Sequence, residues 1–135
     1  MKAIAIVGSP RRGGNTELLA AHTLQAIAGE GIETELVRLA GLDIRPCNAC
    51  MVCRNEKPQP CPMKDDVAPL YEKMKKADAV ILASPVYFSS APSLLKAFME
   101  RVGYISYRDR PFAGKVGGPL VVARRAGQNF TFAEL

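Results

Sequence analysis

Hydrophobic residues occur mainly in short runs, and longer segments with apolar residues at helical spacing separate these runs. A short apolar run that is bounded by turn residues is typical of a strand buried on both faces of a parallel sheet. Three runs have this form, and a fourth segment is predicted as a strand because polar and apolar residues alternate in it. The predicted strands are Lys2–Gly8, the alternating segment Glu33–Leu39, Ala79–Ala83 and Pro119–Ala123.

Helices are predicted between these strands. Leucine and isoleucine recur at helical spacing in Asn15–Ala28, and the glycines that follow end the segment. A second helix begins at Asp65-Asp66, which can cap it, and continues to about Lys76. A third covers Ala91–Arg101. Strands that alternate with helices predict an α/β fold with a doubly wound parallel sheet and helices on both faces, because each parallel connection needs a covering helix.

We expect residues 1–135 to form one domain, since no linker, repeat or low-complexity stretch divides them. Sheets of this kind normally contain five strands, but only Arg124–Leu135 follow the fourth. A fourth strand that is apolar on both faces would be an exposed edge prone to association. We therefore expect that the fifth strand is absent from this chain and that the native protein is longer, with a missing C-terminal part. The alternative is a second chain that covers the edge.

Composition excludes several classes of protein. Hydrophobic residues make up 48% of the chain and charged residues 23%, which is ordinary for a globular protein and excludes disorder, collagen and coiled coil. No apolar run approaches the length of about 20 residues that a membrane-spanning helix needs, so we expect a cytoplasmic protein without a membrane partner. The net charge of +5 comes from scattered basic residues, and tryptophan is absent. This pattern argues against nucleic-acid binding and suits a small anionic ligand.

The segment between the first strand and the first helix, residues 8–16, contains the elements of a phosphate-binding loop. Small residues let backbone N–H groups approach a ligand, and hydroxyls, arginines and the positive end of the helix dipole add to the site. The segment has neither the Gly-Lys-Ser/Thr of a Walker loop nor a GxGxxG pattern. The candidate binding residues are Ser9, Arg11, Arg12, Gly14, Asn15 and Thr16.

The segment after the third strand, residues 84–92, suits a flat ring. It contains two adjacent aromatic residues, and prolines fix its backbone at the carboxyl edge of the sheet, where ligands of such folds bind. Backbone N–H groups between Val86 and Phe88 are placed to donate hydrogen bonds to ring heteroatoms. Combined with a phosphate loop, the pattern indicates a mononucleotide with a planar head group, and FMN fits. The candidate residues are Pro85, Val86, Tyr87 and Phe88.

All four cysteines lie in one insert, residues 47–61, within the irregular stretch Ala40–Lys64. A loop of that length in a compact domain is usually functional. Thiols at such local spacing ligate [4Fe–4S] clusters, zinc also takes four thiolates, and thiols without a metal are the third possibility. The candidate ligands are Cys47, Cys50, Cys53 and Cys61, in a loop that four prolines stiffen: Pro46, Pro58, Pro60 and Pro62.

Other polar side chains are expected to be structural. His22, the only histidine, lies in the middle of the first helix and is expected at the surface or in packing. Lys96 and Arg101 are expected to be solvated or at a subunit contact, and Asp65 and Asp66 to cap a helix. The sequence contains no Ser–His–Asp set and no carboxylate pair that would support hydrolysis, so no side chain is assigned a catalytic role.

These motifs together resemble the NADPH-dependent FMN reductase superfamily of flavodoxin-like proteins, and within it the iron–sulfur flavoproteins of anaerobic archaea and bacteria. The resemblance rests on residues 8–11 with 15–16, the cysteine motif followed by residues 65–66, residues 84–88, and residues 96–101. It implies that Ser9, Arg11, Asn15 and Thr16 bind the FMN phosphate, that residues 85–88 contact the isoalloxazine ring, and that the four cysteines hold a [4Fe–4S] cluster. It also implies a homodimer or dimer-based tetramer in which the cysteine loop lies near a neighbour's flavin.

The resemblance implies an electron-transfer flavoprotein. A one-electron donor such as ferredoxin would supply electrons through the cluster to FMN, and a small acceptor such as oxygen, peroxide or a quinone would receive them. One alternative is an NAD(P)H-dependent FMN or quinone reductase whose cysteines hold no cluster. Another is a zinc-stabilised flavin-binding module without turnover.

Overall fold

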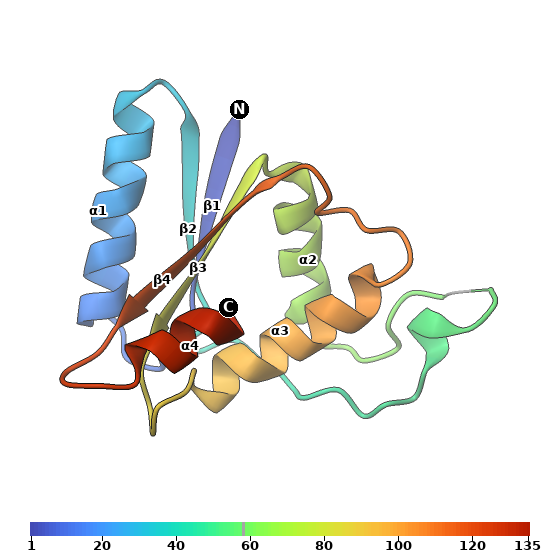
Figure 1. Ribbon diagram of the computed structural model, residues 1–135. Coiled ribbons are helices and arrows are strands. Elements are labelled where there is room, and N and C mark those ends of the chain that lie inside the picture. Colours follow the sequence, from blue (N-terminus) through green and yellow to red (C-terminus); the bar gives the residue numbers. More distant parts are fainter. Residues whose placement is uncertain (58) are drawn as a thin grey trace.

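The computed structural model describes residues 1–57 and 59–135, so the predicted role of Pro58 in stiffening the cysteine segment lies outside the described residues. None of the helices in these two ranges is long and apolar enough to cross a membrane. The elements, in chain order, are β1 (Lys2–Val7), α1 (Asn15–Gly29), β2 (Glu33–Arg38), the 3₁₀ helix η1 (Val52–Arg54), α2 (Val67–Lys76), β3 (Ala79–Pro85), α3 (Ser93–Ser106), β4 (Val116–Val122) and α4 (Gln128–Glu134) (Figure 1).

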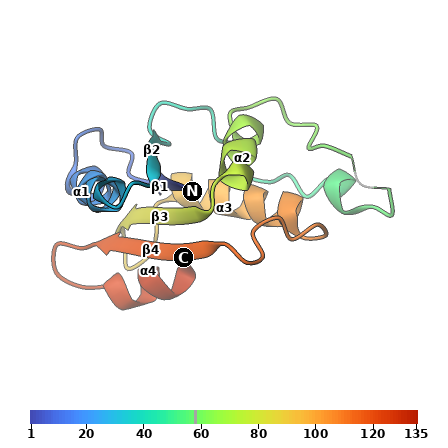
Figure 2. The same cartoon turned by 90° about the horizontal axis from the view of Figure 1, so that it is seen from above.

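The strands form one parallel sheet in the order β2-β1-β3-β4. Ile6 of β1 lies beside Val37 of β2 on one side and beside Leu82 of β3 on the other. This is the order of the flavodoxin-like doubly wound fold up to its fourth strand, and it confirms the predicted fold class. Figure 2 shows β4 at one edge of the sheet, with α4 beyond it. Because β1 and β3 are neighbours, the loops that follow them lie side by side.

Alternate residues of β1 point to opposite faces of the sheet and so build two cores. Figure 1 shows α1 on one face and α2 with α3 on the other. The core under α1 is made of small and medium side chains: Ala3, Ala5, Val7, Ala20, Leu24, Ile81 and Ala83. The core under α2 and α3 is larger and includes Ile4, Ile6, Val67, Leu70, Tyr71, Met74, Leu95, Phe98 and Val102. These two cores fix the carboxyl edge of the sheet, where the candidate loops begin.

Two limits of the predicted elements differ from the prediction by more than two residues, the others agree to within two residues, and η1 and α4 were not predicted. α3 continues to Ser106 and contains Gly103. In the sequence alone, a glycine at this position resembles a helix stop signal. β4 begins at Val116 because Gly117 and Gly118 pair with β3, although glycine gives no strand signal. α4 was not predicted at all. Its phenylalanines are exposed, so it has no apolar face that a pattern can reveal.

β4 is the edge strand of the described sheet. Its residues are half-buried or exposed, whereas the residues of β1 are almost all buried. An apolar groove of about 520 Å³ lies beside it, lined by Phe98, Val102, Phe112 and Leu135 among others. The apolar groove beside β4 is consistent with the expectation that a further strand or a second chain covers this edge.

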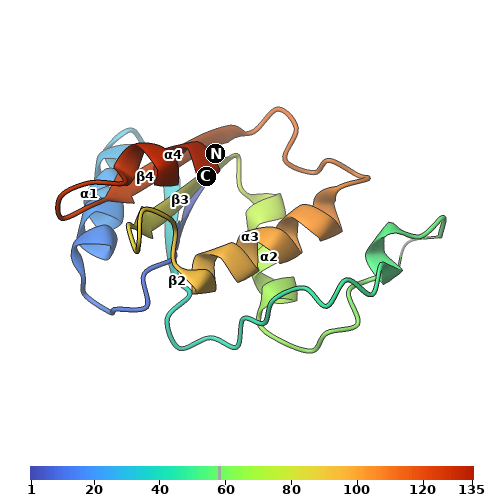
Figure 3. The same ribbon diagram turned by 60° about the horizontal axis from the view of Figure 1, so that its bottom comes forward.

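The segment between β2 and α2 leaves the sheet and runs past α3, with η1 at its far end (Figure 3). Apart from η1 it has no regular structure in the described residues. Left-handed backbone at Ala49 (φ 54°) and Met51 (φ 61°) turns the chain just before η1. The long irregular stretch predicted from the sequence is thus confirmed, and it places the cysteines along the outer part of α3.

Candidate cofactor sites

The phosphate loop, residues 8–16, is built into the end of β1. The Gly8 N–H donates to the carbonyl of Ala83 at 2.8 Å, and a Cβ on Gly8 would lie only 2.5 Å from the Cβ of Leu95. Ser9 and Thr16 are buried, and the Ser9 hydroxyl oxygen accepts the N–H of Arg11 at 3.2 Å. α1 begins after Gly14 without a side-chain cap, so its first N–H groups keep their capacity to bind an anion. The loop fits a phosphate group.

Glu17, which the sequence analysis did not select, braces the phosphate loop. Its carboxylate accepts the Gly13 N–H at 2.9 Å and pairs with Arg38 of β2 at 2.7 Å. These two contacts, that with Arg38 first, lower the pKa of Glu17 below its ordinary value. An acidic residue in the first turn of a helix is common, and only the fold shows that this one ties the loop to β2.

The two arginines of the phosphate loop differ. Arg12 lies over Gly41 and donates to the carbonyl of Ala40 at 3.4 Å, and a Cβ on Gly41 would lie 2.5 Å from its guanidinium. Arg11 is exposed at the surface of the loop. Arg12 therefore joins the loop to the segment after β2.

The aromatic turn, residues 87–90, follows β3. Tyr87 and Ser90 exchange backbone hydrogen bonds at 2.8 and 3.1 Å, which closes a two-residue turn. Phe88 and Ser89 at its tip have φ values of 51° and 61°, a strained backbone for residues that are not glycine. Phe88 is fully exposed at this tip. Strain of this kind is concentrated at functional sites, and an exposed aromatic at the sheet's carboxyl edge suits a flat ring.

One expectation about the aromatic turn is corrected. From the sequence, backbone N–H groups between Val86 and Phe88 are expected to donate to ring heteroatoms. The Val86 N–H instead donates to the carbonyl of Val122 at 2.9 Å, and the Tyr87 N–H closes the turn. Strand pairing and turn closure use these two donors, which leaves only the N–H of Phe88 for a ring.

The loop after β4 supports the aromatic turn. Gly127 has a φ of 90°, and a Cβ there would lie 2.7 Å from Ser89 Cα and 2.9 Å from Val86 Cγ1. From α4, Glu134 accepts the Ser90 hydroxyl at 2.8 Å and the Ala91 N–H at 2.9 Å. Glu134 also pairs with Lys96 at 2.8 Å, and Lys96, the Ala91 N–H and Ser90 lower its pKa to about 2. Lys96 is half exposed, which agrees with the expected solvated side chain, and its ion pair also joins α3 to α4.

The cysteine loop, residues 47–61, carries four free thiols. Cys50 is exposed and the other three are half-buried. The Ala49 N–H donates to Cys47 Sγ at 3.4 Å, and Cys53 Sγ lies 3.8 Å from the carbonyl oxygen of Tyr104. Burial raises the pKa of the Cys53 thiol, and the charges of the other three cysteines raise it further.

Within residues 1–57 and 59–135, the structure gathers no group of three His, Cys, Asp or Glu side chains around a common point. The cysteine loop therefore does not hold a preassembled metal site. The donor set still fits a cluster, because it offers four thiols on one loop and N–H donors to two of them, those of Cys47 and Cys61.

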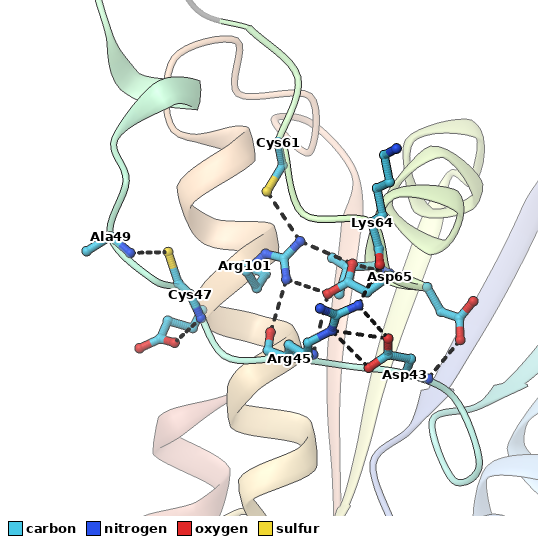
Figure 4. Close-up of polar contacts among 11 residues, drawn as sticks. Asp43, Arg45, Cys47, Ala49, Cys61, Lys64, Asp65 and Arg101 are labelled. Carbon is cyan, nitrogen blue, oxygen red and sulfur yellow. Dashed lines mark hydrogen bonds and ion pairs between the residues drawn. The ribbon is translucent and has the colours of Figure 1, made fainter.

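The two ends of the cysteine loop are joined at a neck, formed by residues 43–45 and 64–66 (Figure 4). The Asp43 N–H donates to Asp66 Oδ2 at 2.8 Å, and the Asp66 N–H donates to the carbonyl of Asp43 at 2.9 Å. Arg45 Nη2 donates to the carbonyl of Lys64 at 2.6 Å. At the far end of the loop, the Arg54 guanidinium lies 3.8 Å from the ring centroid of Tyr107, and Arg108 donates to the carbonyl of Arg54 at 2.9 Å.

Arg101 corrects another expectation. It was expected to be solvated or at a subunit contact, yet its side chain is 1% exposed and that of its partner Asp65 is 0% exposed. Arg101 donates to both carboxylate oxygens of Asp65, at 2.6 and 3.2 Å, and to Cys61 Sγ at 3.3 Å (Figure 4). Burial raises the pKa of Asp65, but the hydrogen bonds from Arg101 and the Val67 N–H outweigh it, and the pKa is lowered. The two residues are 36 positions apart in the sequence, so the local sequence pattern does not predict their ion pair.

Asp65 and the lone histidine lie as expected, whereas the side chain of Asp66 does not cap α2. Asp65 Oδ1 accepts the Val67 N–H at 3.2 Å, as a cap does. Asp66 occupies the N-cap position, but its side chain makes no cap hydrogen bond and accepts the Asp43 N–H at the neck instead. His22 lies at the exposed surface of α1, as expected.

Comparison with known proteins gives matches along the whole chain. Residues 1–134 match the family model of NADPH-dependent FMN reductase. An iron–sulfur flavoprotein of Methanocaldococcus jannaschii is 43% identical over 142 residues, covering 100% of this chain and 69% of that protein. An iron–sulfur flavoprotein of Methanosarcina thermophila is 36% identical over 137 residues, covering 100% of this chain and 71% of that protein.

Solved structures share the fold at lower identity. RosB, crystallised with 8-demethyl-8-formylriboflavin-5'-phosphate, has a TM-score of 0.80 at 22% identity and covers 99% of this chain. This chain spans only 56% of the RosB chain. An NAD(P)H:quinone oxidoreductase from Methanothermobacter marburgensis has a TM-score of 0.66 at 22% identity, covering 99% of this chain and 71% of that one. The architecture is therefore shared with a protein crystallised with a riboflavin-phosphate derivative and with a quinone oxidoreductase.

Proposed function

Because the chain belongs to the NADPH-dependent FMN reductase family, we propose that it is an iron–sulfur flavoprotein that transfers electrons from a one-electron donor, through a [4Fe–4S] cluster on the cysteine loop, to bound FMN. The family match confirms the resemblance on which the sequence analysis relied. It also places the chain among FMN-dependent oxidoreductases, with the electron donor left open.

The observation that carries the proposal is the cysteine loop itself. Four free thiols lie on one segment whose ends are joined by hydrogen bonds, and N–H donors already point at the sulfurs of Cys47 and Cys61. Hydrogen bonds to ligand sulfurs are a general feature of protein-bound clusters. The two relatives that match the full chain at 36–43% identity are named iron–sulfur flavoproteins, which supports the same assignment.

The residues proposed to hold FMN lie in two loops at the carboxyl edge of the sheet. In the phosphate loop they are Ser9, Arg11, Arg12, Gly14, Asn15 and Thr16, and in the segment after β3 they are Pro85, Val86, Tyr87 and Phe88. Buried hydroxyls and the uncapped start of α1 would bind the phosphate, and the exposed ring of Phe88 would cover part of the flavin. When bound, FMN supplies a carrier that accepts electrons singly or in pairs.

The distance along α3 supports a role for a second subunit. The aromatic turn lies at the start of α3, whereas Cys53 and Arg54 contact Tyr104 and Tyr107 near its end. A helical segment from Ser93 to Tyr104 is roughly 16 Å long at 1.5 Å per residue. We therefore propose a homodimer or dimer-based tetramer in which the cysteine loop of one subunit approaches the flavin of another. A ferredoxin-type donor, a small acceptor and a cytoplasmic location are part of the same proposal.

A second candidate is an NAD(P)H-dependent FMN or quinone reductase without a cluster. It is favoured by the observation that the described residues gather no three metal-binding side chains around one point. In this case hydride would reach FMN directly from the nicotinamide, and the cysteines would take no part in electron transfer.

Anaerobic reduction separates the two candidates. Protein purified without oxygen is mixed with NADPH or with a reduced ferredoxin, and the cluster and flavin absorbances are followed over time. The proposal predicts that ferredoxin bleaches both absorbances and that NADPH reduces the flavin slowly or not at all. Rapid flavin reduction by NADPH in a protein without cluster absorbance would favour the second candidate.

A further inference from the structure

We propose that Arg101 is a positioning residue for the cluster: its hydrogen bond to Cys61 fixes one ligand sulfur and raises the reduction potential of a centre bound there. This inference rests on the proposed function, since it concerns the four-cysteine site. It assigns a role to a residue whose hydrogen bonds within the described chain go to Arg45, Asp65 and Cys61.

The guanidinium of Arg101 is held rigidly and out of water. Its side chain is 1% exposed, and its bidentate pair with the fully buried Asp65 fixes the plane of the group. In this orientation Nη2 also donates to Cys61 Sγ at 3.3 Å. A charge-assisted hydrogen bond that is shielded from solvent is stronger than the same contact at the surface.

One turn of α3 contacts both ends of the cysteine loop (Figure 4). Arg101 Nη1 donates to the carbonyl of Arg45 at 3.0 Å, just before Cys47, while Nη2 of the same side chain reaches Cys61. The adjacent Glu100 accepts the Cys47 N–H at 3.1 Å. Hydrogen bonds therefore tie both the first and the last cysteine segment of the motif to the same turn of α3, although the residues between them extend away from the sheet.

Arg101 also carries an unused donor. Its Nε is buried and has no hydrogen-bond partner among the described residues. A buried unpaired N–H is costly, and such groups are rare in folded proteins. The guanidinium that donates to Cys61 therefore keeps one buried N–H that no described residue accepts.

The expected direction of the effect on potential follows from charge. Reduction adds a negative charge to a cluster, so a hydrogen bond to a ligand sulfur stabilises the reduced state more than the oxidised one. Asp65 neutralises the guanidinium as a whole. The effect is therefore local to the bond between Nη2 and Sγ, and a lysine cannot reproduce it, because one ammonium cannot serve the bidentate pair, the carbonyl and the sulfur together.

The test compares wild type, Arg101→Lys and the matched control Arg108→Lys, all purified anaerobically. Arg108 also holds the cysteine loop, through the carbonyls of Arg54 and Glu56, and among the described residues its hydrogen bonds go to these carbonyls and not to sulfur. Iron, acid-labile sulfide and FMN are measured first, and the midpoint potential of the cluster is then determined by EPR-monitored titration. We expect Arg101→Lys to lower the ratio of reduced to oxidised cluster at a fixed potential by about tenfold, a shift of about 59 mV. Arg108→Lys should leave it unchanged.

Each outcome decides the matter. An unchanged potential in Arg101→Lys with a full cluster overturns the inference and leaves the proposed function intact. Loss of iron from Arg101→Lys with FMN retained supports the positioning role. Absence of iron and sulfide from wild type overturns the proposed function and this inference with it. Should Arg101→Lys not fold, the double variant Arg101→Met/Asp65→Asn removes both charges together. We expect the same decrease in the cluster's midpoint potential in this variant, and an unchanged potential would overturn the inference.

Discussion

The phosphate loop and the cysteine loop both lie after a strand of the sheet, β1 and β2 respectively, but the fold holds them in different ways. The phosphate loop is fixed along its length, by the Gly8 contact with β3, by Glu17 and by buried Ser9 and Thr16. The cysteine loop is fixed at its neck and at η1, and its thiols remain apart. The fold thus preforms the proposed phosphate site, whereas the proposed cluster site would need its metal to complete its geometry.

The largest effect is expected when a cysteine is removed. Cys50 is the exposed thiol of the four, so Cys50→Ser should leave the fold intact while removing one of four ligands. We expect iron and sulfide to fall from about four per chain to near zero, with FMN content unchanged. Metal analysis and flavin absorbance measure both. Met51→Ser, at the exposed neighbouring position, is the control and should keep its iron. A parallel loss of FMN would show that the two loops are not independent.

The next effect is expected at Gly127, in the loop that supports the aromatic turn. An added Cβ would meet Ser89 Cα at 2.7 Å, so Gly127→Ala should displace the turn and weaken FMN binding at least about tenfold. Gly114 also has a positive φ but has nothing within 4 Å of an added Cβ. Gly114→Ala therefore carries only the backbone strain of about 1–2 kcal/mol. Fluorescence titration of FMN should separate the two variants, and equal affinities would contradict a role for this loop.

A smaller effect is expected for the hydroxyl of the phosphate loop. Ser9→Ala removes the oxygen that accepts the Arg11 N–H and leaves that donor without its partner. We expect FMN to bind about tenfold more weakly, in line with the cost of one hydrogen bond near an anion, while iron per chain stays the same. Ser106→Ala, which removes a hydroxyl at the far end of α3, is the control. Iron loss in Ser9→Ala would contradict the separation of the two sites.

The smallest effect concerns the contact between α4 and the aromatic turn. Glu134 has a pKa of about 2 in the folded chain against an ordinary 4.5, so its ionised form stabilises the fold above the higher value. This contribution is lost as the pH falls through the folded value. Glu134→Gln should therefore unfold about 1–3 °C below wild type at neutral pH, and the difference should vanish near pH 2. Thermal unfolding across pH measures this, with exposed Glu30→Gln as the control. A difference that persists at pH 2 would assign the effect to packing.

Much of the fold can be predicted from the sequence because parallel strands must be buried on both faces. The runs that became β1 and β3 are apolar for that reason, and their limits are nearly correct. β4 shows the limit of the rule, since its first residues include Gly117 and Gly118, which pair with β3 but have no side chain to bury. α4 shows another limit, because a helix with exposed Phe130 and Phe132 has no apolar face.

The candidate loops could be found from local sequence, but their supports could not. Ser9, Thr16 and the four cysteines are recognisable because their neighbours in the chain form the motif. The pair of Arg101 with Asp65 joins α3 to the neck that precedes α2, and the local sequence around neither residue indicates the other. The same holds for Glu134, which reaches Ser90 and Lys96 from an unpredicted helix. Long-range contacts decide which charged residues are buried, and a single sequence does not record them.

The proposed function requires FMN and a [4Fe–4S] cluster on the same chain. Iron, acid-labile sulfide and zinc per FMN, measured on wild-type protein purified without oxygen, test this requirement. We expect about four iron and about four sulfide per FMN, with no stoichiometric zinc. One zinc per FMN, or flavin with no metal at all, would contradict the cluster and leave an FMN-dependent protein whose cysteines serve another purpose.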